Sequence, residues 1–288
     1  MTRTPNISGG WVTHRGRAVE YRMVDYRDPA QTRPPILVVV PCYNAQRWIE
    51  PCLAALRGND EPHDVLIVED GGTPLDPPIE GDNIIHCRFQ ENIGLIAVLN
   101  FAARFCLGQN YKYYARQDAD DFSMPTRLQK QHETAERTSA DLVSCGAILA
   151  TEDDRYLWEH RGSLPSDLIS ALAYRNIFVH STWFLRTSTF TRIGCYDDRF
   201  VGAEDFDLVQ RIARKGKIVS VEEPLVTYRV HGGSVLGKSN RPARTTVRVM
   251  VRYFSWRRAA CYWGLMRGIA AAIVPRGLKT RVRRLIKG

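Results

Sequence analysis

Residues 34–44 read PPILVVVPCYN, and this stretch decides the fold of the chain. Five consecutive apolar residues, 36–40, are followed at once by proline, cysteine, tyrosine and asparagine. A short β-branched run of this kind is typical of a strand in a parallel sheet that helices cover on both faces. The polar residues after the run would then lie where the strand ends.

The same alternation of short apolar runs and helical patterns continues along the chain. Strands are predicted at 36–40, 65–68, 84–87 and 111–115, and helices at 45–56 and 95–106. Such alternation is typical of βαβ units. The sequence therefore predicts an α/β domain over residues 35–237, with a mostly parallel central sheet flanked by helices. Residues 1–34 form an N-terminal extension with one short strand expected around 18–24.

The charge of the chain is concentrated at one end. Residues 238–288 hold fourteen Lys and Arg and no Asp or Glu, so the whole chain's net charge of +9 leaves −5 for residues 1–237. A mildly acidic domain with a cationic tail does not fit a protein that binds a polyanion over its whole surface. No nucleic-acid partner is predicted.

The cysteines and the apolar segments indicate where the protein resides. Seven cysteines are scattered along the chain without a CxxC pair, which favours a reducing cytosol over a disulfide framework or a zinc site. The N-terminus lacks the apolar run of a signal peptide, and no stretch approaches the ~20 apolar residues of a membrane span. The sequence predicts a cytoplasmic protein whose membrane contact is peripheral.

Polar residues follow three of the predicted strands, at 41–44, 69–72 and 118–121. Ligands of open α/β sheets bind outside the carboxyl ends of the strands, so these segments are expected to line one crevice. Residues 118–121, DADD, place three carboxylates within four residues, a spacing that costs repulsion unless a cation compensates. Hard oxygen ligands suit Mg²⁺ or Mn²⁺. A solvated loop with Ser123 as helix cap explains the neighbouring residues but not the acidic cluster.

Three further motifs each have a structural and a functional interpretation. Asp70 precedes two glycines. These glycines either let a ligand approach the backbone closely beside the Asp70 carboxylate, or they form an ordinary turn with it. Glu204 and Asp205 precede an amphipathic segment, where they cap a helix or supply a general base. His231 precedes two glycines, although a lone histidine is more often a surface or core residue than a ligand.

The basic tail, residues 238–288, has three interpretations: binding to a membrane surface, packing on the catalytic domain, and binding to nucleic acid. It carries arginines at helical spacing, an apolar stripe and interfacial aromatic residues: Arg244, Arg248 and Arg252; Val247, Met250, Val251 and Phe254; and Trp256, Tyr262 and Trp263. A cationic amphipathic helix of this kind binds an anionic membrane surface, which is the interpretation we prefer. Alternatively, the apolar stripe packs on the catalytic domain and the arginines face water.

Taken in order, these segments resemble the family 2 inverting glycosyltransferases of the bacterial non-processive type, which have the GT-A fold. The resemblance covers residues 36–234. It rests on VVPCYN (39–44), VEDG (68–71), ENIG (91–94), ARQDADDFSMPTRL (115–128), EDFDL (204–208) and YRVH (228–231).

The resemblance implies a role for each matching residue. Those expected to shape the site of the nucleotide-sugar donor are Pro41, Tyr43, Asn44, Asp70, Asn92, Arg116 and Asp118. Within this set, Asp70 would bond the base and Asp118 would face the ribose and the donor sugar. Asp120 would bind the Mg²⁺ or Mn²⁺ that bridges the diphosphate, and His231 would reach the same metal or diphosphate. Asp205 would be the catalytic base, with Glu204 on the acceptor side.

The function implied is transfer of a hexosyl or deoxyhexosyl group from a nucleoside-diphosphate sugar, with a UDP-sugar favoured. The acceptor would be a hydroxyl of a glycan or lipid-linked molecule in bacterial cell-surface polysaccharide or lipopolysaccharide synthesis. Residues 238–288 would hold the enzyme on the anionic inner face of the cell membrane. Glu69 and Gly72 depart from the family's usual Asp and Ser. The QxxRW motif of the processive synthases is missing, and its absence favours the addition of a single sugar. A catalytically silent nucleotide-sugar-binding scaffold is the alternative.

Overall fold

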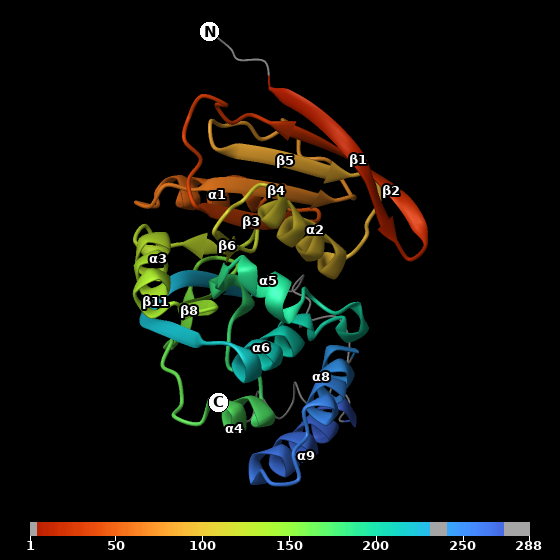
Figure 1. The fold of residues 1–288 in the computed structure, drawn as a ribbon, viewed down its shortest axis with the longest axis vertical. Coiled ribbons are helices and arrows are strands. Elements are labelled where there is room, and N and C mark those ends of the chain that lie inside the picture. The colour runs from red at the N-terminus through yellow and green to blue at the C-terminus, as the bar shows by residue number, and fades with distance from the viewer. Residues whose placement is uncertain (1–4, 231–240, 274–288) are drawn as a thin grey trace. The chain divides into compact units, whose positions relative to one another are not determined.

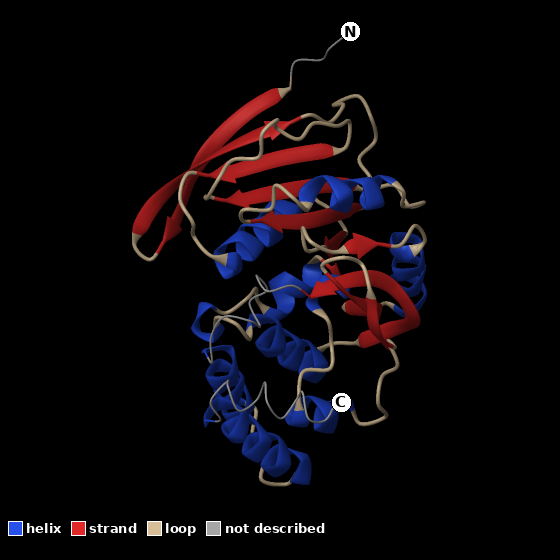
Figure 2. Cartoon of the chain, turned by 180° about the vertical axis from the view of Figure 1, so that it is seen from behind, coloured by secondary structure: helices blue, strands red, loops and turns tan. Residues whose placement is uncertain are grey.

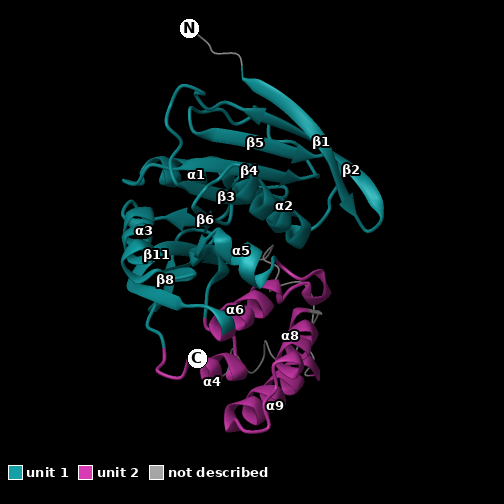
Figure 3. Cartoon of the chain, in the orientation of Figure 1, with its two compact units in different colours: residues 1–164, 178–195, 215–230 teal, residues 165–177, 196–214, 231–288 magenta. Residues whose placement is uncertain are grey.

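The computed structural model describes residues 5–230 and 241–273. The chain divides into two compact units, coloured separately in Figure 3. Unit 1 comprises residues 1–164, 178–195 and 215–230, and unit 2 comprises residues 165–177, 196–214 and 231–288. The chain passes between the units several times, whereas the sequence analysis set linear boundaries after residues 34 and 237. Local composition does not reveal which distant segments pack together.

Unit 1 contains, among the described residues, one eleven-stranded sheet (Figure 1). Its centre consists of four neighbouring parallel strands: β5 (Ile84–Phe89), β4 (Asp64–Asp70), β3 (Ile36–Cys42) and β6 (Tyr113–Arg116). All five residues of the run 36–40 are fully buried, as expected for a strand covered on both faces. The predicted α/β class and its parallel central strands are confirmed.

Antiparallel strands flank this centre on both sides. On one side β2 (Arg17–Asp25) pairs with β5, and β1 (Asn6–His14) pairs with β2. Residues 1–34, for which one short strand was expected, therefore supply a β-hairpin to the sheet. Most side chains of this hairpin are exposed or half-buried, so its apolar pattern is weak in the sequence.

On the other side, β10 (Phe184–Arg186) lies antiparallel between β6 and β8 (Leu142–Thr151). Beyond β8 follow β11 (Ile218–Val230), which is parallel to β8, and β7 (Phe122–Ser123), which is antiparallel to β11. The strand β9 (Tyr156–His160) pairs with β8 off this path. The sheet as a whole is therefore mixed, and the mostly parallel pattern describes its centre.

Helices cover both faces of the central strands (Figures 1 and 2). The helices α1 (Ile49–Arg57) and α3 (Arg127–Thr138) share a buried core with Ile36, Val38 and Val40. The alternate residues of β3 point to the opposite face, where α2 (Leu95–Gly108) contacts β3 and β4. On that face Phe190 of α5 (Ser188–Ile193) packs edge-on against Tyr114. A short 3₁₀ turn, η1 (His180–Thr182), precedes β10.

The regular elements of unit 2, among its described residues, are all helices. The unit contains α4 (Leu168–Tyr174), the 3₁₀ turn η2 (Asp198–Phe200), most of α6 (Glu204–Lys215), α8 (Arg241–Arg252) and α9 (Ala259–Ile273). The helix α9 packs against α4 and α8. None of the helices in the described ranges has the length and apolarity needed to cross a bilayer.

Candidate active site

The carboxyl ends of β4, β3 and β6 lie next to one another at one edge of the sheet, because these strands are parallel neighbours. The loops that leave β3 and β4 are joined by hydrogen bonds. The backbone N–H of Thr73 donates to Oδ1 of Asn44 at 2.9 Å, and the side-chain amide of Gln46 donates to the Thr73 carbonyl at 2.7 Å. Asn44 has a positive φ of 52°, and the side chain of Tyr43 is exposed, where a ligand could reach it.

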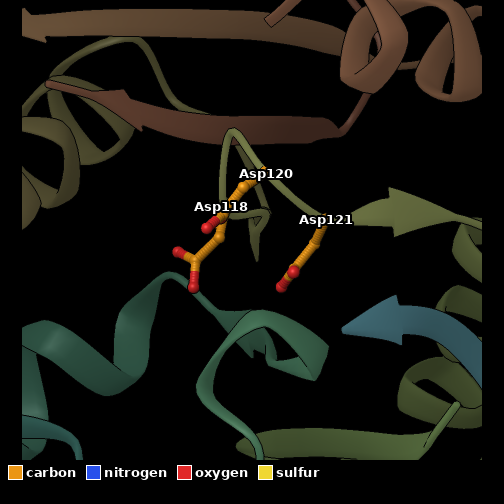
Figure 4. A group of neighbouring side chains, drawn as sticks. All are labelled: Asp118, Asp120 and Asp121. Atoms are coloured by element: carbon orange, nitrogen blue, oxygen red, sulfur yellow. The ribbon is translucent and has the colours of Figure 1, made fainter. Parts of the chain in front are cut away.

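The loop between β6 and β7 carries the acidic motif. Figure 4 shows the side chains of Asp118, Asp120 and Asp121 running from this loop toward the same side. One carboxylate oxygen of each lies within 4.8 Å of the others. Three acidic side chains are therefore brought together as a group that could hold a divalent cation.

The three carboxylates have different surroundings. Asp121 is fully buried, and both its oxygens accept hydrogen bonds, from the Ser181 hydroxyl at 2.5 Å and from the backbone N–H of Arg229 at 2.9 Å. Asp118 is partly exposed and forms an ion pair with the buried guanidinium of Arg116. Asp121 thus ties the loop to β11, while Asp118 and Asp120 complete its acidic face.

Burial and mutual repulsion act on these carboxyl groups. Burial raises the pKa of Asp121 well above its usual range, and the charges of Asp118 and Asp120 raise it further. Burial also raises the pKa of Asp118, with Arg116 opposing this effect and Asp120 adding to it. A divalent cation would offset the repulsion, and carboxylate oxygens are the donors that Mg²⁺ and Mn²⁺ prefer. The three carboxylates are therefore suitable ligands for the predicted Mg²⁺ or Mn²⁺.

A buried arginine that the sequence analysis quoted but did not interpret holds the acidic loop in place. Arg127, at the start of α3, is fully buried. Its guanidinium donates to the carbonyls of Arg116 and Ser181 at 2.7 and 2.9 Å, to Oε1 of Gln117 at 2.6 Å and to Oε1 of Gln131 at 3.0 Å. It joins the end of β6 to η1 across the base of the loop. Nothing in the sequence distinguishes this arginine from one on the outer face of a helix.

Arg229, near the end of β11, is a second buried cation beside the loop. Its guanidinium lies over the rings of Phe122 and Trp48, with centroid distances of 3.8 and 5.0 Å, and bonds both oxygens of Asp154. Cation–π contacts and a two-point ion pair fix its side chain. The backbone N–H of the same residue donates the hydrogen bond to Asp121 described above.

Asp70, at the end of β4, is engaged by the loop that precedes α2. Its two oxygens accept hydrogen bonds from the backbone N–H of Ile93 at 2.6 Å, from that of Gly94 at 2.9 Å and from the side chain of Asn92 at 3.0 Å. Burial raises its pKa despite these donors. Gly71, at φ 64°, lets this loop approach, because a Cβ there would lie 2.6 Å from the backbone nitrogen of Asn92. Asp70 and Asn92, two predicted donor-site residues, thus form one structural group.

Glu69, which departs from the family's usual aspartate, has its own partners. It is buried, and it bonds Nε2 of His86 at 2.7 Å, Arg88 at 2.9 Å and the backbone N–H of Leu75 at 2.9 Å. Burial would raise the pKa of Glu69, but the bonds from His86 and Leu75 hold it below its usual value. Arg88 also donates to the Gly72 carbonyl at 2.8 Å. The longer side chain of Glu69 thus supports the loop that contains Gly72.

Two cavities of unit 1 lie elsewhere. One, of about 530 Å³, is lined by Arg27, Asp64 and neighbours at the amino end of β4, and the other, of about 590 Å³, by residues that include Leu107 and Arg186. Neither is lined by residues 41–44, 70–72 or 117–121. The guanidinium of Arg27 is bonded by Asp25 and Asp64, so the first cavity is bordered by an internal ion-pair network.

Glu204 and Asp205 begin α6 in unit 2. Glu204 accepts a hydrogen bond from the backbone N–H of Gly202 at 2.7 Å. Asp205 accepts one from the N–H of Phe206 at 2.7 Å and one from the side-chain amide of Asn176 at 2.8 Å. Removal from bulk solvent and the adjacent charge of Glu204 raise the pKa of Asp205 to about 7. A carboxyl group with this pKa is suited to proton transfer near neutral pH, beyond any capping of the helix.

The predicted residues are therefore distributed as follows. Unit 1 holds those at the carboxyl edge of the sheet: Pro41, Tyr43, Asn44, Asp70, Asn92, Arg116, Asp118 and Asp120. Unit 2 holds Glu204 and Asp205. His231, predicted at the metal, lies outside the described residues.

Comparison with known proteins gives the same class. The model of the family described as "Glycosyl transferase family 2" matches residues 37–194, more than half of the chain. WbnJ, an O-antigen biosynthesis glycosyltransferase of Escherichia coli, is 27% identical over 180 residues, which cover 59% of this chain and 69% of that protein. An uncharacterized glycosyltransferase of Haemophilus influenzae is 24% identical over 238 residues, covering 76% and 72%.

Solved structures share the fold. TarS of S. aureus (residues 1–349, with UDP-GlcNAc) aligns with a TM-score of 0.60 at 15% identity, over 82% of this chain and 72% of that one. The mannosyltransferase PcManGT of Pyrobaculum calidifontis, with GDP-Man and Mn²⁺, aligns with a TM-score of 0.57 at 18% identity, over 85% and 71%. The sheet and its acidic edge loop define a GT-A glycosyltransferase. Within that class, the chain belongs to glycosyltransferase family 2.

Proposed function

We propose that this protein transfers a sugar from a nucleoside-diphosphate sugar to an acceptor hydroxyl, with inversion at the anomeric carbon. The observation that carries the proposal is the convergence of Asp118, Asp120 and Asp121 on one face of a loop at the carboxyl edge of the sheet. Ligands of open α/β sheets bind at this edge. A cation there would serve a substrate that carries a diphosphate.

The donor we favour is a UDP-sugar that transfers a hexosyl or deoxyhexosyl group. TarS has been solved with UDP and UDP-GlcNAc, and PcManGT with GDP-Man and Mn²⁺, which supports a nucleotide-sugar donor. Tyr43 and Asn44, on the exposed loop after β3, would contact the nucleotide, with Pro41 below them. Asp70 and Asn92 would shape the pocket through the loop they hold together.

Mg²⁺ or Mn²⁺ would be held by Asp120, while Asp118 would face the ribose and the donor sugar. Both oxygens of Asp121 already accept hydrogen bonds from the protein. When bound, the ion would offset the negative charge that develops on the departing diphosphate. His231 is a further candidate ligand. Arg116 would keep Asp118 oriented through their ion pair.

Asp205 would act as the general base. The acceptor oxygen forms its bond to the anomeric carbon as the bond from that carbon to the diphosphate breaks, and the hydroxyl proton passes to Asp205. A single displacement inverts the configuration. The pKa of about 7 leaves a substantial fraction of Asp205 ionised at neutral pH, and Asn176 orients its carboxylate. Glu204 would lie on the acceptor side.

The relatives suggest the biological setting. WbnJ is named for O-antigen biosynthesis, which supports assembly of a cell-surface polysaccharide or lipopolysaccharide and an acceptor that is a glycan or a lipid-linked molecule. We expect such an acceptor to lie at the inner face of the cell membrane. The basic segment 238–288 would hold the enzyme at that anionic surface.

The proposal is tested by incubating the full chain with a panel of nucleotide sugars and Mn²⁺. The released nucleoside diphosphate is measured, and the anomeric configuration of the product is read by NMR. Release from at least one donor, with an inverted linkage in the product, is the expected result. Donor binding without any release would instead support a catalytically silent scaffold, and a retained configuration would exclude the single displacement.

A further inference from the structure

The helix α9 of unit 2 has its small residues on the inside and its large apolar residues on the outside. The buried positions are Cys261, Gly264 and Gly268. A Cβ added at Gly264 would lie 2.1 Å from the carbonyl oxygen of Ala173 in α4, and one added at Gly268 would lie 2.9 Å from the sulfur of Met250 in α8. These glycines let α9 pack closely, and as a result its larger side chains face outward.

The outward face of α9 is apolar along its whole length. Four exposed apolar side chains follow one another along this face at helical spacing: Tyr262, Met266, Ile269 and Ile273. Trp263 is exposed beside Tyr262. The helix contains a single charged residue, Arg267, which donates to the Tyr174 carbonyl at 3.0 Å and lies over the Tyr174 ring. A surface helix normally shows the reverse pattern, with polar side chains outward. An exposed apolar face of this kind marks a surface that binds a membrane or another molecule.

The predicted apolar stripe falls on α8 and just after it, whereas two of the predicted interfacial aromatic residues, Tyr262 and Trp263, lie on α9. In α8, Val249 and Met250 are buried within unit 2 and the exposed face carries Arg244 and Arg248. Of the predicted stripe, Met250 is buried and Val247 and Phe254 are half-buried, whereas Val251 is 57% exposed. The continuous exposed apolar face of the basic tail lies on α9, and Trp256, just before this helix, is also exposed.

We infer that the outward face of α9 lies in the interface of an anionic lipid bilayer, parallel to the membrane plane. The inference deepens the membrane contact proposed above and does not depend on the chemistry of the acidic loop. Tryptophan and tyrosine favour the level of the lipid headgroups, and isoleucine and methionine favour the acyl chains beneath. Trp263 and Tyr262 supply the first kind of side chain, and Ile269 and Ile273 the second.

Charge selects lipid as the occupant over a second copy of the chain. Arg257, just before α9, is exposed, and the sequence after α9, residues 274–288, adds six Lys and Arg and no acidic residue. Two copies of a segment with this excess of positive charge would repel each other. Anionic headgroups would instead be attracted by the basic residues near the membrane.

The test is co-sedimentation of the full chain with vesicles of phosphatidylcholine, alone or mixed with phosphatidylglycerol. We expect binding to the mixed vesicles that weakens as salt is raised, and little binding to phosphatidylcholine alone. Trp263→Ala should weaken binding to the mixed vesicles by about tenfold or more, because one large apolar side chain no longer leaves water. Trp11→Ala is the matched control, since Trp11 on β1 is 67% exposed and Trp263 is 64% exposed. This control should bind like the wild type.

The inference is overturned if Trp263→Ala binds the mixed vesicles as tightly as the wild type, or if the wild type does not bind them. It is also overturned if light scattering shows a dimer in solution that Trp263→Ala dissociates, since a second copy would then cover α9. Release of nucleoside diphosphate in lipid-free solution should be the same for wild type, Trp263→Ala and Trp11→Ala. This assay separates a failure of the membrane inference from a failure of the proposed reaction.

Discussion

Asp205 is the residue whose surroundings best match a catalytic task. An ordinary aspartate is fully ionised at neutral pH and is a weak base, whereas the pKa of Asp205 is raised to about 7. Its burial and the neighbouring Glu204 cause the increase, and Asn176 and the N–H of Phe206 limit it. Structural capping of α6 would not require a raised pKa. The base is therefore the functional role that these surroundings favour.

Asp205→Asn should lower kcat by about 10²–10⁴-fold, because no group of suitable basicity is then left to take the proton of the acceptor hydroxyl. Donor affinity should be unchanged. The folded state should be no less stable at pH 8, since a carboxyl group whose pKa is raised on folding favours the fold at low pH, and this contribution is lost as the pH rises through about 7. Steady-state kinetics with thermal unfolding check both points. Near-normal turnover with intact donor binding would show that Asp205 is not the base.

Glu204→Gln should shift the pH profile of the reaction. The wild-type kcat/KM should fall as the pH drops below about 7, where Asp205 becomes protonated. Removing the negative charge of Glu204 lowers the pKa of Asp205, so this limb should move to lower pH. Glutamine keeps an oxygen that can accept the N–H of Gly202. An unmoved limb would mean that another group controls the profile.

At the residue scale, the acidic motif could be located from the sequence, but the different surroundings of its three carboxylates could not be predicted. Asp118, Asp120 and Asp121 are identical in type, and only their surroundings separate them. The buried Asp121 bonds Ser181 and the N–H of Arg229, both distant in sequence. No local pattern predicts such contacts, because they depend on how η1 and β11 pack beside the loop.

At the scale of elements, α3 and β6 are joined by Arg127. Its guanidinium satisfies the carbonyls of Arg116 and Ser181 and two side-chain amides in a fully buried position. A buried charge is tolerated only when such bonds surround it. The residue therefore fixes the strand end from which Asp118 projects.

Arg127→Met should destabilise the protein by on the order of 3–5 kcal/mol, since several buried acceptors lose their donor. Arg192→Met is the control, because Arg192 is a largely exposed partner of Asp141 and its loss should cost about 1 kcal/mol or less. Denaturant unfolding measures both variants. Equal effects for the two arginines would contradict a special role for Arg127.

The elements themselves could be predicted where their apolar runs are buried on both faces. Residues 36–40 and 65–68 gave strands that the structure contains in β3 and β4, because a continuous β-branched run has few alternatives. The hairpin of β1 and β2 was largely missed, since most of its residues are half-buried or exposed. Its pairing with β5 is a long-range contact that no local pattern encodes.

For the whole molecule, each of the two compact units is assembled from segments that are distant in the chain. Unit 2 contains residues 165–177, 196–214 and 231–288, and the last of these ranges includes the basic tail, residues 238–288. Composition marked that segment as distinct, yet α8 and α9 belong to the same unit as α4 and α6. The helical segment therefore has a structural role in unit 2 in addition to the membrane contact we propose for α9.

The central claim is that the acidic loop of unit 1 binds a nucleotide-sugar donor through a divalent ion. It is tested most directly by titrating the full chain with UDP-sugars in a calorimeter, with Mn²⁺ or with EDTA, and repeating the titration with Asp120→Asn. We predict binding that needs Mn²⁺ and that Asp120→Asn weakens by at least about tenfold, while Asp205→Asn binds like the wild type. Donor binding that is equally tight in EDTA and unaffected by Asp120→Asn would contradict the account.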